Sequence, residues 1–140
     1  MERLARCAVR RLRLFEPGQL AITFISDQRM RSLNRRFLGH DWPTDVLSFR
    51  YDQAPGRKPQ AASRRLQHAA CSLQPIVGEI LIAPSQARAY ARAHGVPYEE
   101  ELARYIVHGL LHWMGHEDKT LAQQKRMRSL EDQVLAQCYR

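Results

Sequence analysis

The chain has 140 residues, close to the commonest size of one domain, so we predict a single domain that spans residues 1–140. Its formal net charge of +8 comes mostly from arginine, which favours a polyanionic partner such as nucleic acid, although an arginine-rich genome would give the same count. Arginines also interrupt the amino terminus before any long apolar run, which argues against a secretory signal and a membrane span.

The predicted elements follow one another without an internal repeat. An amphipathic helix near residues 4–12 is followed by an apolar strand at 20–26, and Asp27 is expected to cap the next helix. A turn at 39–43 leads into an alternating strand at 45–51, with Val46, Ser48 and Arg50 on one side. The later elements are a basic loop at about 52–75, a strand at 77–83, helices at 84–95 and from Pro97, and a last helix at 121–138.

The cysteines Cys7, Cys71 and Cys138 are scattered, odd in number and without C-x-x-C spacing. This pattern predicts neither a disulfide framework nor a cysteine zinc site, and it fits a reducing cytoplasm.

A histidine pair dominates the second half of the chain, in the pattern H-x3-H-x2-G-x2-D from His108 to Asp118. On a helix, His108 and His112 project from the same face, and Gly115 can end that helix so that the chain turns back. Two nitrogens and one oxygen would leave one tetrahedral position open, as in a catalytic zinc site. His116 is the competing third donor. A bare histidine pair can also be a partly buried helix face with local hydrogen bonds.

The residue after His108 narrows the chemistry further. In zincin peptidases a glutamate follows the first histidine and serves as the general base, whereas Gly109 stands here. A peptidase is therefore disfavoured.

Several strings in the chain resemble the YbeY family of bacterial single-strand-specific endoribonucleases, also called rRNA maturation factors. They are Leu33-Asn34, PTDVLSF at 43–49, GEILI at 78–82 and the motif from His108 to Gly115, in the order and at intervals similar to those of the family. The resemblance runs from about residue 20 to 135. It implies an α+β fold, a small mixed β-sheet flanked by helices, with a zincin-like metal helix and one zinc ion.

The chain departs from the family pattern in three places. Asp118 replaces the usual third histidine ligand, and an oxygen ligand there can still bind zinc. Leu38 stands where the family commonly has arginine, so Arg35, Arg36 or His40 would have to substitute. The usual first strand of the family is missing, because the chain begins at the helix.

The implied reaction is hydrolysis of an RNA phosphodiester by a metal-activated water, with His108, His112 and Asp118 as ligands. Glu117 is the candidate proton acceptor, with Glu79 as a second, although both also have ordinary structural interpretations. Thr44 and Ser48 are candidates for binding phosphate or lining the cleft. Arg50, together with Arg57, Arg64 and Arg65 of the loop, is expected to follow the RNA backbone.

The expected partner is single-stranded RNA, rRNA or its precursors, in the cytoplasm, with roles in rRNA maturation and ribosome quality control and no membrane association. The small ribosomal subunit is a further candidate partner. Two other functions stay open at this point. One is a ribosome-associated assembly factor with weakened catalysis, and the other is a metal-dependent hydrolase of a small substrate.

Overall fold

The computed structural model describes residues 1–14, 18–51 and 75–139. The predicted basic loop, with Arg57, Arg64 and Arg65, lies outside these ranges as far as residue 74. The described elements are α1 (Glu2–Arg11), β1 (Gln19–Phe24), α2 (Asp27–Leu38), β2 (Val46–Arg50), β3 (Ile76–Ile82), α4 (Pro84–His94), α5 (Tyr98–Trp113) and α6 (Leu121–Cys138).

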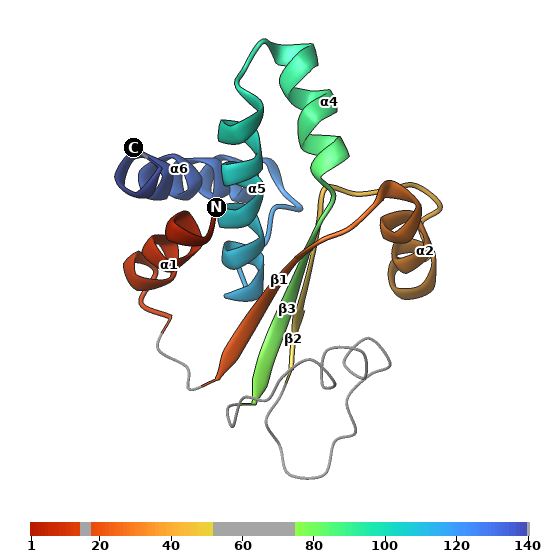
Figure 1. Cartoon of the computed structure of the whole chain (residues 1–140), viewed down its shortest axis with the longest axis horizontal. Helices are drawn as coiled ribbons and strands as arrows, with labels where there is room; N and C mark the ends of the chain where they lie inside the picture. The colour runs from red at the N-terminus through yellow and green to blue at the C-terminus, as the bar shows by residue number, and fades with distance from the viewer. Residues whose placement is uncertain (15–17, 52–74, 140) are drawn as a thin grey trace.

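The strands form one mixed sheet in the order β1-β3-β2, so the predicted α+β class is confirmed. β1 runs parallel to β3, and β2 runs antiparallel to β3. β3 is therefore the central strand, and its near-continuous burial agrees with that place. Within the described residues β1 is the first strand and follows α1, as predicted (Figure 1).

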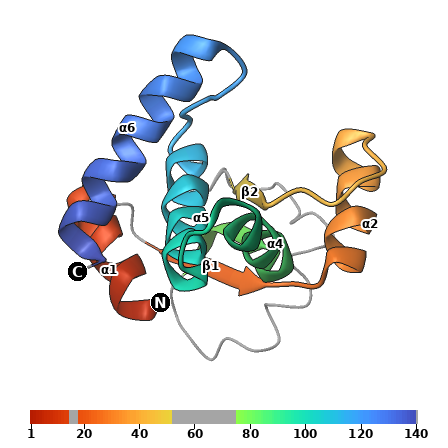
Figure 2. The ribbon, with the colours of Figure 1, turned by 90° about the horizontal axis from the view of Figure 1, so that it is seen from above.

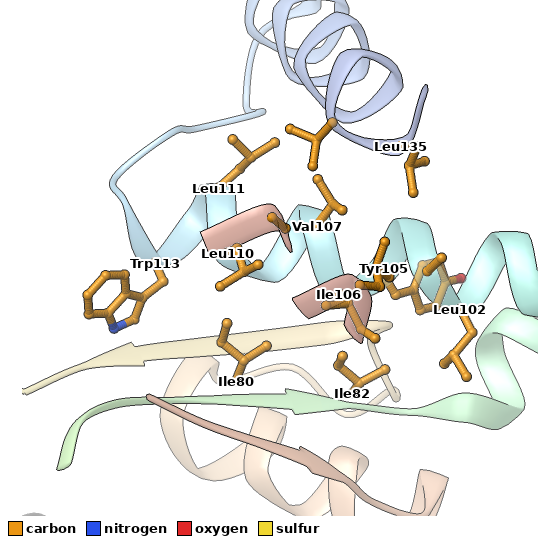
Figure 3. Close-up of a cluster of buried hydrophobic side chains, with 14 of the residues drawn as sticks. Ile80, Ile82, Leu102, Tyr105, Ile106, Val107, Leu110, Leu111, Trp113 and Leu135 are labelled. Atoms are coloured by element: carbon orange, nitrogen blue, oxygen red, sulfur yellow. The ribbon is translucent and has the colours of Figure 1, made fainter. Parts of the chain in front are cut away.

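Helices cover both faces of the sheet. α5 lies across one face with α1 and α6 behind it, whereas α2 lies on the opposite side of the sheet (Figure 2). The larger core joins Ile80 and Ile82 of β3 to Ile106 and Leu110 of α5 (Figure 3). A smaller core on the other face includes Met30 of α2. The chain thus holds α5 between the sheet and α6.

The alternation predicted for the second strand is confirmed by its register. Val46 pairs with Ile82, Ser48 with Ile80, and Arg50 with Gly78. Since paired residues point to the same face, these three side chains lie on the face that packs against α5. Their placement near α5 is what brings β2 into the functional site.

Local signals explain most helix boundaries. The Ser26 hydroxyl caps α2 by accepting from the Arg29 amide at 3.3 Å, so the predicted cap at Asp27 was wrong by one residue. A left-handed Gly39, with φ of 71°, ends the same helix. At α6, Thr120 and Gln123 form a capping box.

Cys7 and Cys138 form a disulfide that joins α1 to α6, with the two Cα atoms 5.6 Å apart. The prediction of no disulfide was therefore wrong for this pair. Spacing along the chain could not reveal it, because the two residues are 131 positions apart and meet only when α1 packs beside α6. Cys71 lies outside the described residues.

None of the helices in the described ranges is long and apolar enough to cross a membrane.

Candidate metal centre

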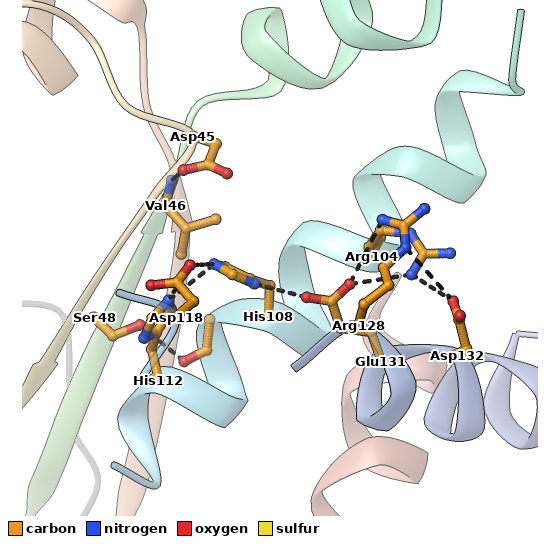
Figure 4. Close-up of polar contacts among 11 residues, drawn as sticks. Asp45, Val46, Ser48, Arg104, His108, His112, Asp118, Arg128, Glu131 and Asp132 are labelled. Carbon is orange, nitrogen blue, oxygen red and sulfur yellow. Dashed lines mark hydrogen bonds and ion pairs between the residues drawn. The ribbon is translucent and has the colours of Figure 1, made fainter. Parts of the chain in front are cut away.

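His108 and His112 lie one turn apart on α5, with their Nε2 atoms 2.9 Å from each other (Figure 4). The helix ends at Trp113, and Gly115 then adopts a positive φ of 96°, a conformation that glycine enters at little cost. This turn brings Asp118 back, so that its Oδ2 lies 3.7 Å from His108 Nε2 and 3.5 Å from His112 Nε2.

The three donor atoms fit a single metal ion. Ligands at about 2.0–2.1 Å from a tetrahedral zinc would be about 3.3 Å from one another. The observed separations of 2.9, 3.5 and 3.7 Å scatter around that value. Among the described residues, His108, His112 and Asp118 are the one group of three or more such donors whose ligand atoms all lie within 4.8 Å of one another. His116, the alternative third donor, is outside this group.

A buried charge network stands behind His108 (Figure 4). Glu131 of α6 approaches His108 Nδ1 with its Oε1 at 2.7 Å, and its Oε2 accepts from Arg104 at 3.1 Å. Arg104 also donates to Asp132 at 2.7 Å, and Arg128 lies 3.8 Å from Glu131. Burial lowers the pKa of His108, but the hydrogen bond and charge of Glu131 outweigh it, so the pKa is raised.

Sequence reasoning missed both Glu131 and Arg104. A signal was nevertheless present, because Glu131 lies on the helix face that also carries the core residues Met127, Val134 and Leu135. A charged residue on an apolar stripe is rarely fully buried unless it is paired. Glu131 could have been singled out for that reason, although its partner could not.

Gly109 allows α5 to lie directly on the sheet. A Cβ atom there would be 2.5 Å from Ile80 Cγ2 and 3.0 Å from Val46 Cγ1. The position therefore faces the core and has no room for the glutamate of a zincin peptidase. This packing gives a physical reason for the absence of that general base.

Two of the candidates, Ser48 and Arg50 of β2, contact α5. Ser48 Oγ donates to the Gly109 carbonyl at 2.8 Å, which ties β2 to the metal helix. The Arg50 guanidinium lies 4.7 Å from the centre of the Trp113 ring and donates to the Trp113 carbonyl at 3.4 Å. Thr44 lies in the segment before β2, where its hydroxyl donates to Asp45 at 3.1 Å.

The two candidate proton acceptors are in different places. Glu117 is in the turn before Asp118 and forms an ion pair with Lys119 at 2.8 Å, which lowers its pKa and keeps the carboxylate ionised. Glu79 is buried on β3 and accepts from the Tyr51 hydroxyl at 3.2 Å. It alternates with Ile80, so it lies on the sheet face turned away from α5. Glu79 is therefore poorly placed to act at the metal centre.

The residues near the missing arginine have other contacts. Leu38 is exposed at the end of α2. Arg35 is paired with Asp41, Arg36 lies over the Phe37 ring, and His40 stacks on Trp42 with ring centres 4.5 Å apart. These contacts do not single out a replacement for the guanidinium that Leu38 lacks.

A cavity of about 230 Å³ opens beside His108. Its wall has four carboxylates but only two guanidinium groups, those of Arg104 and Arg128; the carboxylates belong to Asp45, Glu101, Asp118 and Glu131. Such a wall favours cations and hydrogen-bond donors over phosphate, which would be repelled by the negative side chains.

Comparisons with known proteins agree with the fold and the motifs. The sequence model of the family described as Endoribonuclease YbeY matches residues 1–139. A protein of Desulfitobacterium hafniense named Endoribonuclease YbeY is 34% identical over 122 residues, which cover 87% of this chain and 73% of the relative. A protein of the same name from Brevibacillus brevis is 33% identical over 133 residues, covering 94% and 82%.

Similarity to a solved structure supports the fold alone. The solution structure of a Thermotoga maritima protein superposes with a TM-score of 0.56 at 23% identity, covering 96% of this chain and 81% of that one. With the family match across 1–139, these findings show that the chain belongs to the endoribonuclease YbeY family.

Proposed function

We propose that this protein is a zinc-dependent endoribonuclease that cleaves single-stranded RNA, with rRNA and its precursors as substrates. Membership of the endoribonuclease YbeY family makes it a hydrolase of RNA phosphodiester bonds. The observation that carries the proposal is the convergence of His108, His112 and Asp118 at the end of α5. We further propose that it acts in the cytoplasm as one domain, in rRNA maturation and ribosome quality control.

The donor set supports zinc as the metal. Two imidazole nitrogens and one carboxylate oxygen are ligands that zinc takes at catalytic sites with one open position. When bound, such an ion supplies Lewis acidity, which makes water nucleophilic near neutral pH and stabilises charge on phosphoryl oxygens. His108 and His112 would act as neutral ligands, so neither would serve as the proton acceptor.

The other proposed site residues act on the substrate. Arg50 is our candidate for binding phosphate, because its guanidinium is held over Trp113 beside the end of the metal helix. Ser48 contacts the same helix through the Gly109 carbonyl, and Thr44 lies in the segment just before β2, where it donates to Asp45. Glu117, ionised beside Lys119, is the candidate proton acceptor. The acidic cavity beside His108 favours an approach of the RNA backbone from the Arg50 side.

A cleavage assay tests the proposal. Wild-type protein should cut a labelled single-stranded rRNA fragment, and activity should disappear in His112→Ala and under excess chelator, then return for wild type on adding zinc. His94→Ala is a matched control, since this exposed histidine lies at the end of α4. Cleavage that survives both His112→Ala and chelation would contradict the proposed site.

A second candidate function is a ribosome assembly factor that binds RNA, and the small subunit, with weakened catalysis. The observation that favours it is Leu38, at the position where the family commonly has arginine. If that guanidinium stabilises the transition state, Leu38→Arg should raise the cleavage rate by about tenfold or more, since a charge-assisted hydrogen bond contributes about 1.5–3 kcal/mol. RNA binding without cleavage in every variant would favour the assembly factor.

A further inference from the structure

We propose that Glu131 positions His108 for metal binding by fixing which of its ring nitrogens carries the proton. This inference rests on the proposed metal site and adds to it a residue from α6 that does not touch the metal. The Glu131 carboxylate lies 2.7 Å from His108 Nδ1, on the opposite side of the ring from His112 and Asp118 (Figure 4).

The surroundings of Glu131 keep it a hydrogen-bond acceptor. Its side chain is only 6% exposed, and a carboxylate so deeply buried is stable in its charged form only when it is paired. Arg104 supplies the pairing charge at 3.1 Å and is itself 11% exposed. Asp132 holds the same guanidinium at 2.7 Å. With one oxygen held by Arg104, Glu131 presents its other oxygen to the imidazole as an acceptor.

The tautomer of His108 follows from this contact. An ionised carboxylate can only accept, so the Nδ1 atom of His108 must donate and carries the proton. In the neutral ring, Nε2 then has its lone pair free, and this is the atom that lies 2.9 Å from His112 Nε2 and 3.7 Å from Asp118 Oδ2. Without Glu131, the proton could reside on Nε2 and would have to leave before a metal could bind.

The partner also restrains the ring in space. Glu131 belongs to α6, which packs on α5 through Met127, Val134 and Leu135. The carboxylate is thus delivered by a helix that is fixed in the core. Carboxylate partners of this kind orient metal-binding histidines and raise their basicity, and their loss typically costs about 10- to 100-fold in metal affinity.

Two variants separate the hydrogen bond from the charge. Glu131→Gln keeps an oxygen that can accept from Nδ1 but removes the charge, whereas Glu131→Met removes the acceptor and keeps a similar volume. Glu101→Gln is the matched control, because Glu101 is a buried carboxylate on the wall of the same cavity that makes no hydrogen bond to His108. Circular dichroism and thermal unfolding of the metal-free proteins identify any variant that fails to fold.

The first readout is zinc affinity, measured by competition with a chromophoric chelator at constant pH. Affinity should fall by roughly 10-fold in Glu131→Gln and by up to about 100-fold in Glu131→Met, with a smaller change in Glu101→Gln. Equal affinity of Glu131→Met and wild type would overturn the inference, because this variant lacks the acceptor for Nδ1. If Glu131→Met does not fold, the tautomer of the wild-type protein decides.

The second readout is the tautomer itself, from the ¹⁵N chemical shifts of the His108 ring in metal-free protein. Wild type and Glu131→Gln should carry the proton on Nδ1, and Glu131→Met should lose that preference. A proton on Nε2 in wild type would refute the inference. If zinc binding depends on His108 and His112 but not on Glu131, this inference fails while the metal site stands. If wild type binds no zinc, both fail.

Discussion

Gly109 lies where α5 packs on the sheet, and Gly109→Ala should loosen that contact. The added methyl would be 2.5 Å from Ile80 Cγ2 and 3.0 Å from Val46 Cγ1. Carbon atoms normally pack at about 3.5–4.0 Å, so one of the partners must move by about 1 Å. Ile80 is fully buried, so any movement of its side chain displaces other core residues.

The expected cost combines two opposing effects. Overpacking a well-filled core costs about 1–3 kcal/mol. Replacing glycine by alanine inside a helix recovers about 0.5–1 kcal/mol. We therefore expect a net loss of about 1–2 kcal/mol in the free energy of unfolding, or roughly 3–8 °C in Tm for a chain of this size. Any retreat of α5 would also stretch the bond from Ser48 to the Gly109 carbonyl.

Thermal and urea unfolding of the metal-free protein measure the effect, and Ile80→Ala completes a double-mutant cycle. Ile80→Ala alone should cost about 2–5 kcal/mol, because it leaves a cavity. In the double mutant the new methyl occupies part of that cavity, so the combined loss should be smaller than the sum by about 1 kcal/mol or more. A stability of Gly109→Ala equal to or above that of wild type, or strict additivity, would refute this account of the helix contact.

Three further predictions concern the ligand choice, a buried carboxylate and the disulfide. Asp118→Ala should weaken zinc binding by more than about 100-fold, because the loss of a residue that only supports a ligand already costs about 10- to 100-fold in affinity. A larger loss of affinity in His116→Ala than in Asp118→Ala would show that His116 is the third ligand. Burial raises the pKa of Glu79 in the folded protein, despite the hydrogen bond from Tyr51. The folded state is therefore favoured while Glu79 is protonated, and this stability is lost as the pH rises through the folded-state pKa. Glu79→Gln should accordingly have a higher Tm than wild type at neutral pH, and this difference should disappear below the pKa that Glu79 has in the unfolded chain. Cleavage activity should persist in the variant. A lower Tm than wild type at pH 7 would contradict this prediction. Reducing the disulfide should lower the Tm of wild type but not that of Cys7→Ser. The loss of chain entropy in the unfolded state limits the effect to about 5 kcal/mol for a link across 131 positions. Equal Tm values of oxidised and reduced wild type would argue against the bond.

Periodicity and end signals predicted the elements well because these features are local. The last helix was predicted at 121–138, and α6 spans Leu121–Cys138. The alternation of Val46, Ser48 and Arg50 placed them on one face, and their pairing with β3 agrees. The histidine spacing and Gly115 likewise predicted a turn that brings an acidic residue back to the helix. Asp118 is in that position, close to both histidines.

Contacts between distant elements could not be predicted in this way. Nothing near Glu131 in the sequence names His108 as its partner, since the two are 23 positions apart on helices whose crossing is set by core packing. The Cys7–Cys138 pair is hidden for the same reason. Glu79 is a further case. Its place on the sheet face turned away from α5 depends on how β3 is oriented in the sheet, which the pattern of the isolated strand does not determine.

The proposed metal ligands and Leu38, where the family resemblance leads us to expect arginine, belong to different parts of the fold, and this separation bears on how the activity can vary. His108 and His112 are held by α5, which is fixed by its contact with the sheet at Gly109 and by Glu131 of α6. Leu38 is exposed at the end of α2, which packs on the other side of the sheet. A change at Leu38 should therefore leave the groups proposed to hold the metal undisturbed. For this reason, metal content alone cannot distinguish an efficient nuclease from an RNA-binding factor with weakened catalysis, whereas the rate of Leu38→Arg can.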